Sequence, residues 1–375
     1  MPLPPEPDRT AIRLAERLIQ LLGRGGFTAT YKYAVLIAIM DLCMELTSAT
    51  GLPPDMITTR QLAEKVIALY WPHCAPYEDT GKELRQNTGK GETQAEIIRH
   101  IVAFRKGATV NPSASLPLSR ARASAAPDAY EKLVCVIEWK LVEMPLPRLQ
   151  VIGGEEDRFL YEYGFTKETS KRAVNEAQQG KGHGFDNRLL LKPGVSAALI
   201  ALNGILRPLI YRDWGRLVAS MNTLEEPTLE RFLFGEDRIS LDPVRPALRK
   251  LQHDRCFYCE KDLGASCHVD HFVPWARHAD NSIDNLVAAH DDCNGKKSDY
   301  LAAAEHVVRW RERGARCAGD LAEIARKEAW ETRPERTLSV ARAIYRMLPD
   351  DARLWLSGKS FLVIDRPRIA SALAA

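Results

Sequence analysis

Three closely spaced elements determine the architecture of the carboxyl-terminal region: Cys256-Phe-Tyr-Cys259, His268-Val-Asp-His271 and His290-Asp-Asp-Cys293-Asn-Gly-Lys-Lys. A Cys-x-x-Cys turn places two thiolates on one side of a tight knuckle, and a second ligand pair further along the chain can complete a tetrahedral zinc site. In a reducing compartment, clustered cysteines indicate metal binding more often than a disulfide. We therefore predict one structural Zn²⁺ ion bound by Cys256, Cys259, His290 and Cys293.

Cys267 is the rival ligand, because it lies in the same window. It immediately precedes the Asp-His element, so we expect a buried thiol there. The other cysteines are scattered, and we expect them to be buried thiols with no part in the chemistry: Cys43, Cys74, Cys135 and Cys317.

This window resembles the HNH, or ββα-metal, endonuclease family over about residues 256–301. Besides the two ligand pairs, the resemblance rests on further elements in the family's order: Asp270-His271, Pro274, Asn285-Leu and Cys293-Asn-x-x-Lys. It implies a small ββα-metal nuclease fold that hydrolyses phosphodiester bonds. Such a reaction needs an activated water and neutralisation of the charge that develops at the phosphate.

By this resemblance, His271 is the general base that deprotonates water, and an imidazole that titrates near neutrality suits that task. Asp270 and Asn294 would hold one catalytic Mg²⁺ or Mn²⁺ ion through oxygen atoms, which hard cations prefer. Asn285 would hold the loop that carries the base in position by hydrogen bonding.

The roles of three neighbouring side chains, those of Lys297, Asn294 and His268, each have an alternative. Lys297 would contact the scissile or an adjacent phosphate, with Lys296 as the weaker candidate. Asn294 either binds the metal or only caps a helix. His268 is either a partner of the metal site or a solvent-facing side chain. We also expect Asp270→Ala to abolish cleavage with little loss of fold.

Length and composition limit the class of protein. The chain has 375 residues, 45% hydrophobic and 27% charged, with a formal net charge of +3. This composition excludes wholesale disorder, a collagen-like repeat and a multi-span membrane protein, and the charge alone does not indicate a nucleic-acid binder. The start, Met1 to Asp8, is rich in proline and is expected to be an extended arm instead of a secretory signal, so we expect a cytoplasmic protein.

The chain length predicts two to three domains at about 150 residues each. We expect a mainly helical protein with small β elements. The predicted parts are a helical amino-terminal domain at 1–106, a linker or long loop at 107–127, a middle helical segment with a possible hairpin at 128–240, and the nuclease domain with carboxyl-terminal helices at 241–375.

The amino-terminal part contains a very apolar helix, Tyr33 to Thr47, and two capping-box patterns, Thr58 to Gln61 and Thr93 to Glu96. The helix that starts at Gln61 has two interpretations. It is part of a helix-turn-helix or winged helix that reads DNA, or it belongs to a helical packing domain without direct contacts.

In the middle segment we expect a helix from Asp128 to Glu143. Two β-prone runs around Gly153-Gly154, one at 149–154 and one at 158–163, predict a hairpin or a wing. Gly194 to Asn222 is helical, with a kink or break at Pro208.

After the nuclease window, helices are expected at Tyr300–Arg313, Gly319–Trp330 and Arg336–Met347, followed by a short strand or docking tail at Ser360–Asp365. Basic residues recur here and before the window. They form either a surface that follows phosphates or ordinary solvated helix faces: Arg245, Arg249, Lys250, Arg255, Arg309, Arg311, Arg313, Arg316, Arg326, Lys327, Arg333, Arg336, Arg342 and Arg346.

The function that these elements favour is a metal-dependent HNH endonuclease that cuts DNA, with restriction or anti-phage defence as its role. The alternatives are a zinc-stabilised nucleic-acid-binding protein without nuclease activity, and an HNH nuclease that acts on RNA. One ββα-metal unit supplies one cutting centre, so a double-strand break would need a homodimer or two successive nicks. A regulatory partner protein is compatible with the long amino-terminal region.

Overall fold

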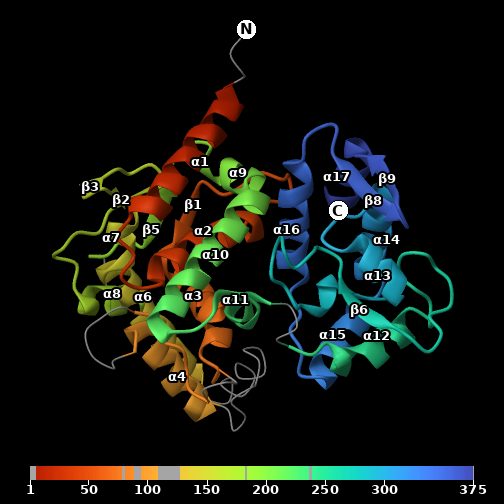
Figure 1. Ribbon diagram of the computed structural model, residues 1–375, viewed down its shortest axis with the longest axis horizontal. Helices are drawn as coiled ribbons and strands as arrows, with labels where there is room; N and C mark the ends of the chain where they lie inside the picture. The colour runs from red at the N-terminus through yellow and green to blue at the C-terminus, as the bar shows by residue number, and fades with distance from the viewer. Residues whose placement is uncertain are drawn as a thin grey trace. The chain divides into compact units, whose positions relative to one another are not determined.

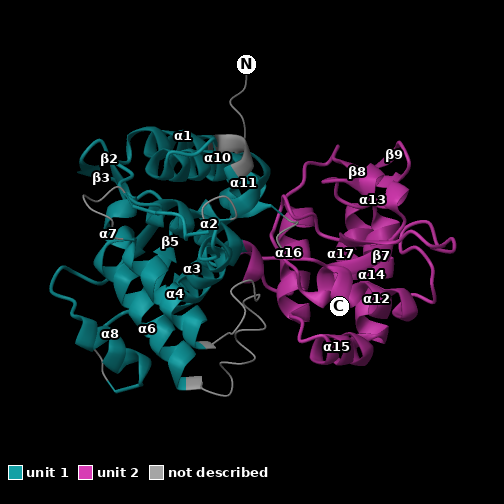
Figure 2. Ribbon diagram, turned by 60° about the horizontal axis from the view of Figure 1, so that its bottom comes forward, with its two compact units in different colours: residues 1–43, 54–238 teal, residues 44–53, 239–375 magenta. Residues whose placement is uncertain are grey.

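The computed structural model describes residues 6–77, 81–87, 94–108, 127–181, 184–235 and 239–374. The chain divides into two compact units, one made of residues 1–43 and 54–238 and the other of 44–53 and 239–375 (Figure 2). Helices predominate in both units and the strands are short (Figure 1). The predicted fold class, mainly helical with small β elements, is confirmed. Most of the predicted linker, residues 109–126, lies outside the described residues, as does Thr93 of the second capping box.

The described helices of the first unit are α1 (Glu6–Arg24), α2 (Tyr31–Glu45), α3 (Thr59–His73), α4 (Glu96–Ala108), α6 (Pro127–Glu143), α7 (Pro145–Leu149), α8 (Lys171–Gln178), α9 (Val195–Ala201), α10 (Asn203–Asn222) and α11 (Glu226–Phe234). The end of α2 belongs to the second unit, because the division falls after Cys43. The helix predicted at Asp128 to Glu143 is α6.

Helix α2 is the core of the first unit. Every residue from Tyr33 to Met44 is buried, which explains why the sequence of this helix is apolar on all sides. Its one charged residue in this run, Asp41, forms ion pairs with Arg207 of α10 and Lys65 of α3. A buried carboxylate is tolerated only when it is paired in this way.

Helix α3 begins with the predicted capping box. The Thr58 side chain accepts a hydrogen bond from the amide of Gln61, and the Gln61 side chain accepts one from the amide of Thr58. None of its residues is exposed, and its polar side chains bond within the unit, as in the bidentate pair of Arg60 with Glu131 at 2.7 Å. This burial favours the packing interpretation of α3, since a helix that reads DNA needs a free polar face.

The first unit also holds a three-stranded antiparallel sheet in the order β1 (Met56–Thr58), β5 (Arg188–Leu191), β4 (Tyr161–Tyr163). The predicted pairing of the two runs around Gly153-Gly154 was wrong in its second strand. The hairpin consists of β2 (Val151–Ile152) and β3 (Glu155–Glu156), and the run at 158–163 pairs with β5 instead. Both glycines have positive φ, as a two-residue hairpin turn requires, and this tight turn determines the partner strand.

Two further expectations are corrected in this unit. Helix α1 already begins at Glu6, because Pro7 lies in the first turn, where a helix needs no amide donor. The break expected at Pro208 lies at Leu202, between α9 and α10, which are bent by 79°. Among the described residues no single helix is long and apolar enough to cross a membrane; α9 and α10 meet that test only as a bent pair.

The described elements of the second unit are η2 (Asp242–Val244), α12 (Arg245–Leu251), β6 (His268–His271), η3 (Ile283–Asn285), β7 (Leu286–Ala289), α13 (Asp291–Lys297), α14 (Ala304–Arg316), α15 (Ala318–Lys327), α16 (Pro334–Arg346), β8 (Arg353–Ser357), β9 (Ser360–Val363) and α17 (Arg366–Ala374). Strands β6 and β7 are antiparallel and are followed by α13, which gives the ββα order. The three helices and the terminal strand predicted after the window are α14, α15, α16 and β9.

Helix α14 supports the ββα segment from one side. Its Trp310 stacks on Phe272 with ring centroids 4.7 Å apart. Its Arg309 donates to the carbonyls of Phe257 and Tyr258, and its buried Arg313 donates to the carbonyl of Leu286 at 2.6 Å. These guanidinium groups therefore serve as internal braces.

Several arginines of the predicted basic set are engaged inside the unit. Arg313 and Arg342 are buried, and Arg336 is paired with the buried carboxylate of Asp280 at 2.7 Å. Arg326 forms a bidentate pair with Glu323. The arginines named here are therefore buried or paired with carboxylates.

Residues 44–53 belong to the second unit, and their contacts with it include a side-chain pair and a hydrogen bond to a carbonyl. Glu45 is 2.8 Å from Nε2 of the buried His278, and the carbonyl of Thr50 accepts a hydrogen bond from Arg346 of α16. Gly51 has a φ of +78°, and a Cβ there would lie 2.8 Å from a terminal nitrogen of Arg346. Glycine is therefore required both by the backbone conformation and by the close approach of the guanidinium.

Candidate zinc centre and catalytic site

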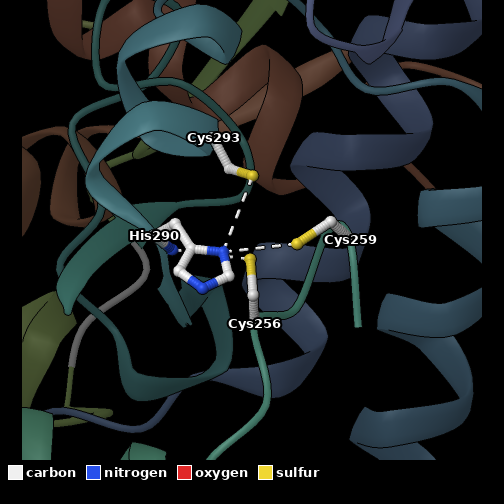
Figure 3. A group of neighbouring side chains, drawn as sticks. All are labelled: Cys256, Cys259, His290 and Cys293. Carbon is white, nitrogen blue, oxygen red and sulfur yellow. Dashed lines mark hydrogen bonds between the residues drawn. The ribbon is translucent and has the colours of Figure 1, made fainter. Parts of the chain in front are cut away.

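Four side chains converge at one end of the ββα segment. One ligand atom of each of Cys256, Cys259, His290 and Cys293 lies within 4.8 Å of the others, and Figure 3 shows the sulfur atoms around the His290 ring. Nδ1 of His290 is 3.3 Å from the sulfur of Cys259 and 4.0 Å from that of Cys293. The knuckle between Cys256 and Cys259 thus faces the start of α13, as the spacing predicts.

The chemistry of this donor set fits zinc. Nε2 of His290 lies 2.8 Å from the carbonyl oxygen of Asp262, and because a carbonyl only accepts, Nε2 carries the hydrogen and Nδ1 keeps its lone pair toward the sulfurs. Burial and the neighbouring sulfurs raise the pKa of Cys293 to about 12. A divalent cation is what allows all three sulfurs to be thiolates together at neutral pH.

Cys267 is not part of this group. It is 6% exposed, and burial raises the pKa of its thiol. It is the buried thiol that the sequence predicted. Of the scattered cysteines, Cys43 and Cys74 are buried, whereas Cys135 and Cys317 are only partly so.

His271 occupies the last position of β6 and is 5% exposed. Its Nε2 lies 2.7 Å from the side-chain oxygen of Asn281, and its ring centroid is 5.3 Å from that of Trp275. Since the carboxamide oxygen only accepts, the imidazole hydrogen is on Nε2 and the lone pair is on Nδ1. The imidazole is therefore held in the tautomer that leaves Nδ1 available as a base.

Asn285 organises the loop that follows His271. Its side chain is fully buried, accepts a hydrogen bond from the amide of Val273 at 2.8 Å and donates to the carbonyls of Val273 and Asp280. The amide of Phe272 donates to the carbonyl of Asn285. These bonds connect both ends of the loop that separates β6 from β7.

Asp270, the neighbour of His271, is 8% exposed and is held by two side chains. The hydroxyl of Tyr258, in the zinc knuckle, donates to one of its carboxylate oxygens. The ammonium of Lys297 lies 3.0 Å from the same oxygen and donates to the carbonyl of His271 at 2.8 Å. The carboxylate therefore links β6, the zinc knuckle and the end of α13.

This arrangement does not agree with two expectations. Lys297 is 0% exposed, so it is an internal partner of Asp270 and not a side chain that faces a phosphate. Lys296, the weaker candidate, is the exposed lysine, although it pairs with Asp292. Removing the Asp270 carboxylate would leave a buried ammonium without its partner, so Asp270→Ala cannot be neutral to the fold.

Asn294 and His268 lie at the edge of the site. Asn294 is on α13, which packs beside β6; it is half-buried, and its carboxamide makes no hydrogen bond to any described residue. The His268 side chain is 48% exposed and lies 3.5 Å from the exposed Asp291. His268 is therefore the solvent-facing histidine of the two alternatives.

Sequence reasoning missed Tyr258 and Asn281. Tyr258 lies between the two knuckle cysteines, and an aromatic residue at that position is expected only to pack in the core. Asn281 is ten positions after His271 in an irregular loop, and no spacing rule connects the two. Only the folded loop brings the carboxamide to the imidazole.

Residues 256–303 match the family model of the HNH endonuclease, which agrees with the resemblance over 256–301. Residues 13–233 match the model of a domain of unknown function, DUF8808, over more than half of the chain. The chain belongs to the DUF8808 family. No curated protein and no solved structure shows significant similarity to it. The chain thus combines a DUF8808 region with an HNH endonuclease domain, which supports a nuclease and implies a divalent metal and a nucleic-acid substrate.

We predict about one zinc ion per chain, because a closed four-ligand site retains its metal. Cys259→Ser should lower the zinc content of purified protein by removing one thiolate and should lower the melting temperature. Cys267→Ser, the matched control, should keep its zinc. Elemental analysis and thermal melting measure both effects. Absence of zinc from the wild-type chain, or equal loss in both variants, would contradict the ligand set.

We predict that Asp270→Ala destabilises the second unit by about 3 kcal/mol, because breaking a buried ion pair strands the remaining charge. The double variant Asp270→Ala/Lys297→Met should recover most of this loss, since both charges are then removed. Urea unfolding measures the effect, with Asp292→Ala, which breaks the exposed pair on the same helix, as the control. An unchanged stability of Asp270→Ala would mean that the pair is not structural.

Proposed function

We propose that this protein is a metal-dependent HNH endonuclease that hydrolyses DNA. The observation that carries the proposal is the position of His271. Asn281 fixes which nitrogen of its imidazole carries the lone pair, and its neighbour Asp270 supplies a carboxylate at the same strand end. Asn294, whose carboxamide bonds to no described residue, lies on the helix packed beside that strand. These are the groups that phosphodiester hydrolysis requires.

In this mechanism, Nδ1 of His271 accepts a proton from the attacking water. Asn281 stabilises the imidazolium that results, because its oxygen already accepts the hydrogen on Nε2. Asn285 keeps the loop after the strand in position, so the imidazole does not need to reorganise during the reaction. A general base placed in this way contributes about 10²- to 10⁴-fold to the rate.

Asp270 and Asn294 are the residues that would hold the catalytic Mg²⁺ or Mn²⁺, because both offer oxygen ligands. When bound, the ion would neutralise charge at the phosphate and the leaving oxygen. Tyr258 and Lys297 orient the Asp270 carboxylate, because both contact one of its oxygens and the Lys297 ammonium also lies 3.4 Å from the other. They are positioning residues in this account, since neither ammonium nor hydroxyl is accessible to substrate.

Lys296 replaces Lys297 as the proposed phosphate contact. Its ammonium is exposed on α13, and its exposed pair with Asp292 costs little to break. The DUF8808 region is proposed to serve target recognition, partner binding or regulation, with the domain limits predicted above. A role in restriction or anti-phage defence, a cytoplasmic location and a homodimer that makes double-strand breaks remain parts of this proposal.

The experiment is cleavage of supercoiled plasmid and of single-stranded RNA by the full chain, with Mg²⁺ or Mn²⁺ and with a chelator at a concentration that leaves zinc bound. We expect nicking of the plasmid, faster than cleavage of RNA, and no reaction with chelator. Asn294→Ala should lower the rate at limiting Mg²⁺ by about tenfold or more, since it removes a metal ligand. Glu312→Ala, which removes an exposed carboxylate on α14, is the control.

Three outcomes separate the alternatives. Faster cleavage of RNA than of plasmid DNA would indicate that RNA is the substrate. DNA binding without cleavage by zinc-loaded protein would favour a zinc-stabilised binding protein. Equal rates for Asn294→Ala and Glu312→Ala would remove Asn294 from the proposed metal site.

A further inference from the structure

A second site of interest lies outside the HNH domain. In the second unit, an open pocket of about 530 Å³ is lined by residues 49–51, by α16 and by α17. This volume is within the range of small-molecule sites, which is about 300 to 1,000 Å³. The lining side chains that matter are Arg342, Tyr345, Arg346, Arg366, Ile369 and Leu373.

Arg342 is the unusual member of this set. It is 8% exposed, and its Nε donates to the carbonyl of Leu373, but it forms no ion pair with any described residue. Burial lowers the pKa of its guanidinium. A buried cation without a carboxylate is costly, and a bound anion is one way to offset that cost.

Arg346 adds a second positive charge at the same wall. It follows Arg342 by four residues on α16, so the two side chains share one helix face. Its guanidinium bonds to the carbonyl of Thr50 and has no carboxylate partner among the described residues. Gly51 leaves room for this guanidinium, because a Cβ there would collide with it.

The third arginine is already neutralised. Arg366, at the start of α17, pairs with Asp350 and donates to the carbonyls of Arg346 and Leu348. It holds α17 against the end of α16 and so keeps the cavity in shape. The net charge available to a ligand is therefore that of Arg342 and Arg346.

The remaining wall is apolar. Tyr345, Ile369 and Leu373 are buried. The Tyr345 hydroxyl donates a hydrogen bond to the carbonyl of Ala302. A ligand for this cavity must combine an anionic end with an apolar or planar body. Guanidinium groups bind phosphate through two parallel hydrogen bonds, which favours phosphate for the anionic end.

We propose that this cavity binds a phosphorylated small molecule of nucleotide size, with its phosphates at Arg342 and Arg346 and its base against Ile369 and Leu373. The site is separate from the zinc ligands and from His271, and the proposal does not depend on nuclease activity. It gives the carboxyl-terminal helices after the HNH domain a ligand-binding role.

The test is isothermal titration of the full chain with ATP, with sodium tripolyphosphate as a probe that has the charge but no base. ATP should bind more tightly than tripolyphosphate. Arg346→Glu should weaken ATP binding by at least about tenfold, because it removes charge-assisted hydrogen bonds and adds repulsion. Arg346 is exposed, so this variant should fold; Arg342→Met, which keeps the aliphatic stem, tests the buried partner.

Arg353→Glu is the control, because it reverses an exposed arginine on β8 that does not line the cavity. Its affinity for ATP should equal that of the wild type. Asn294→Ala should also bind ATP normally, which separates this site from the nuclease. No binding of ATP at about 1 mM, equal affinity for tripolyphosphate, or unchanged affinity in Arg346→Glu would each overturn the proposal.

Discussion

The buried ion pair between Asp270 and Lys297 is the constraint on which the carboxyl-terminal site depends. The ammonium has no access to solvent, lies 3.0 Å from the carboxylate and also bonds to the carbonyl of His271. A buried ammonium is stable only when its carboxylate partner stays in contact with it. The pair therefore fixes the end of α13 against the end of β6. The hydroxyl of Tyr258 extends the same cluster to the zinc knuckle. The zinc ligands and the Asp270 carboxylate are thereby connected through one buried cluster.

The helices that follow the HNH domain explain how so short a motif is kept in shape. Arg309 and Arg313 of α14 donate to carbonyls on both sides of the motif, and Arg336 of α16 neutralises the buried Asp280 beside Asn285. Several arginines of this region therefore bind carbonyls and a carboxylate inside the second unit. A count of basic residues overestimates the charge that remains for a polyanion.

The sequence predicts best where the chemistry is local. The zinc ligands, the Thr58 capping box and the apolar helix around Asp41 are visible because spacing or periodicity within a few residues carries the signal. Lys297 was misjudged because its direction depends on a strand 26 residues earlier in the chain. Asn281 was missed because an irregular loop has no period, and the pairing of the strand at 158–163 with β5 is a long-range contact that local β propensity cannot specify.

We propose His271 as the base of a DNA-cleaving centre. The most direct measurement is the single-turnover rate of plasmid nicking at saturating Mg²⁺ by wild-type protein and by His271→Ala, with zinc content and DNA affinity measured on the same samples. We expect the His271→Ala variant to lose about 100-fold or more in rate, with its zinc content and DNA affinity unchanged. Equal rates, or the absence of nicking by zinc-loaded wild-type protein, would contradict it.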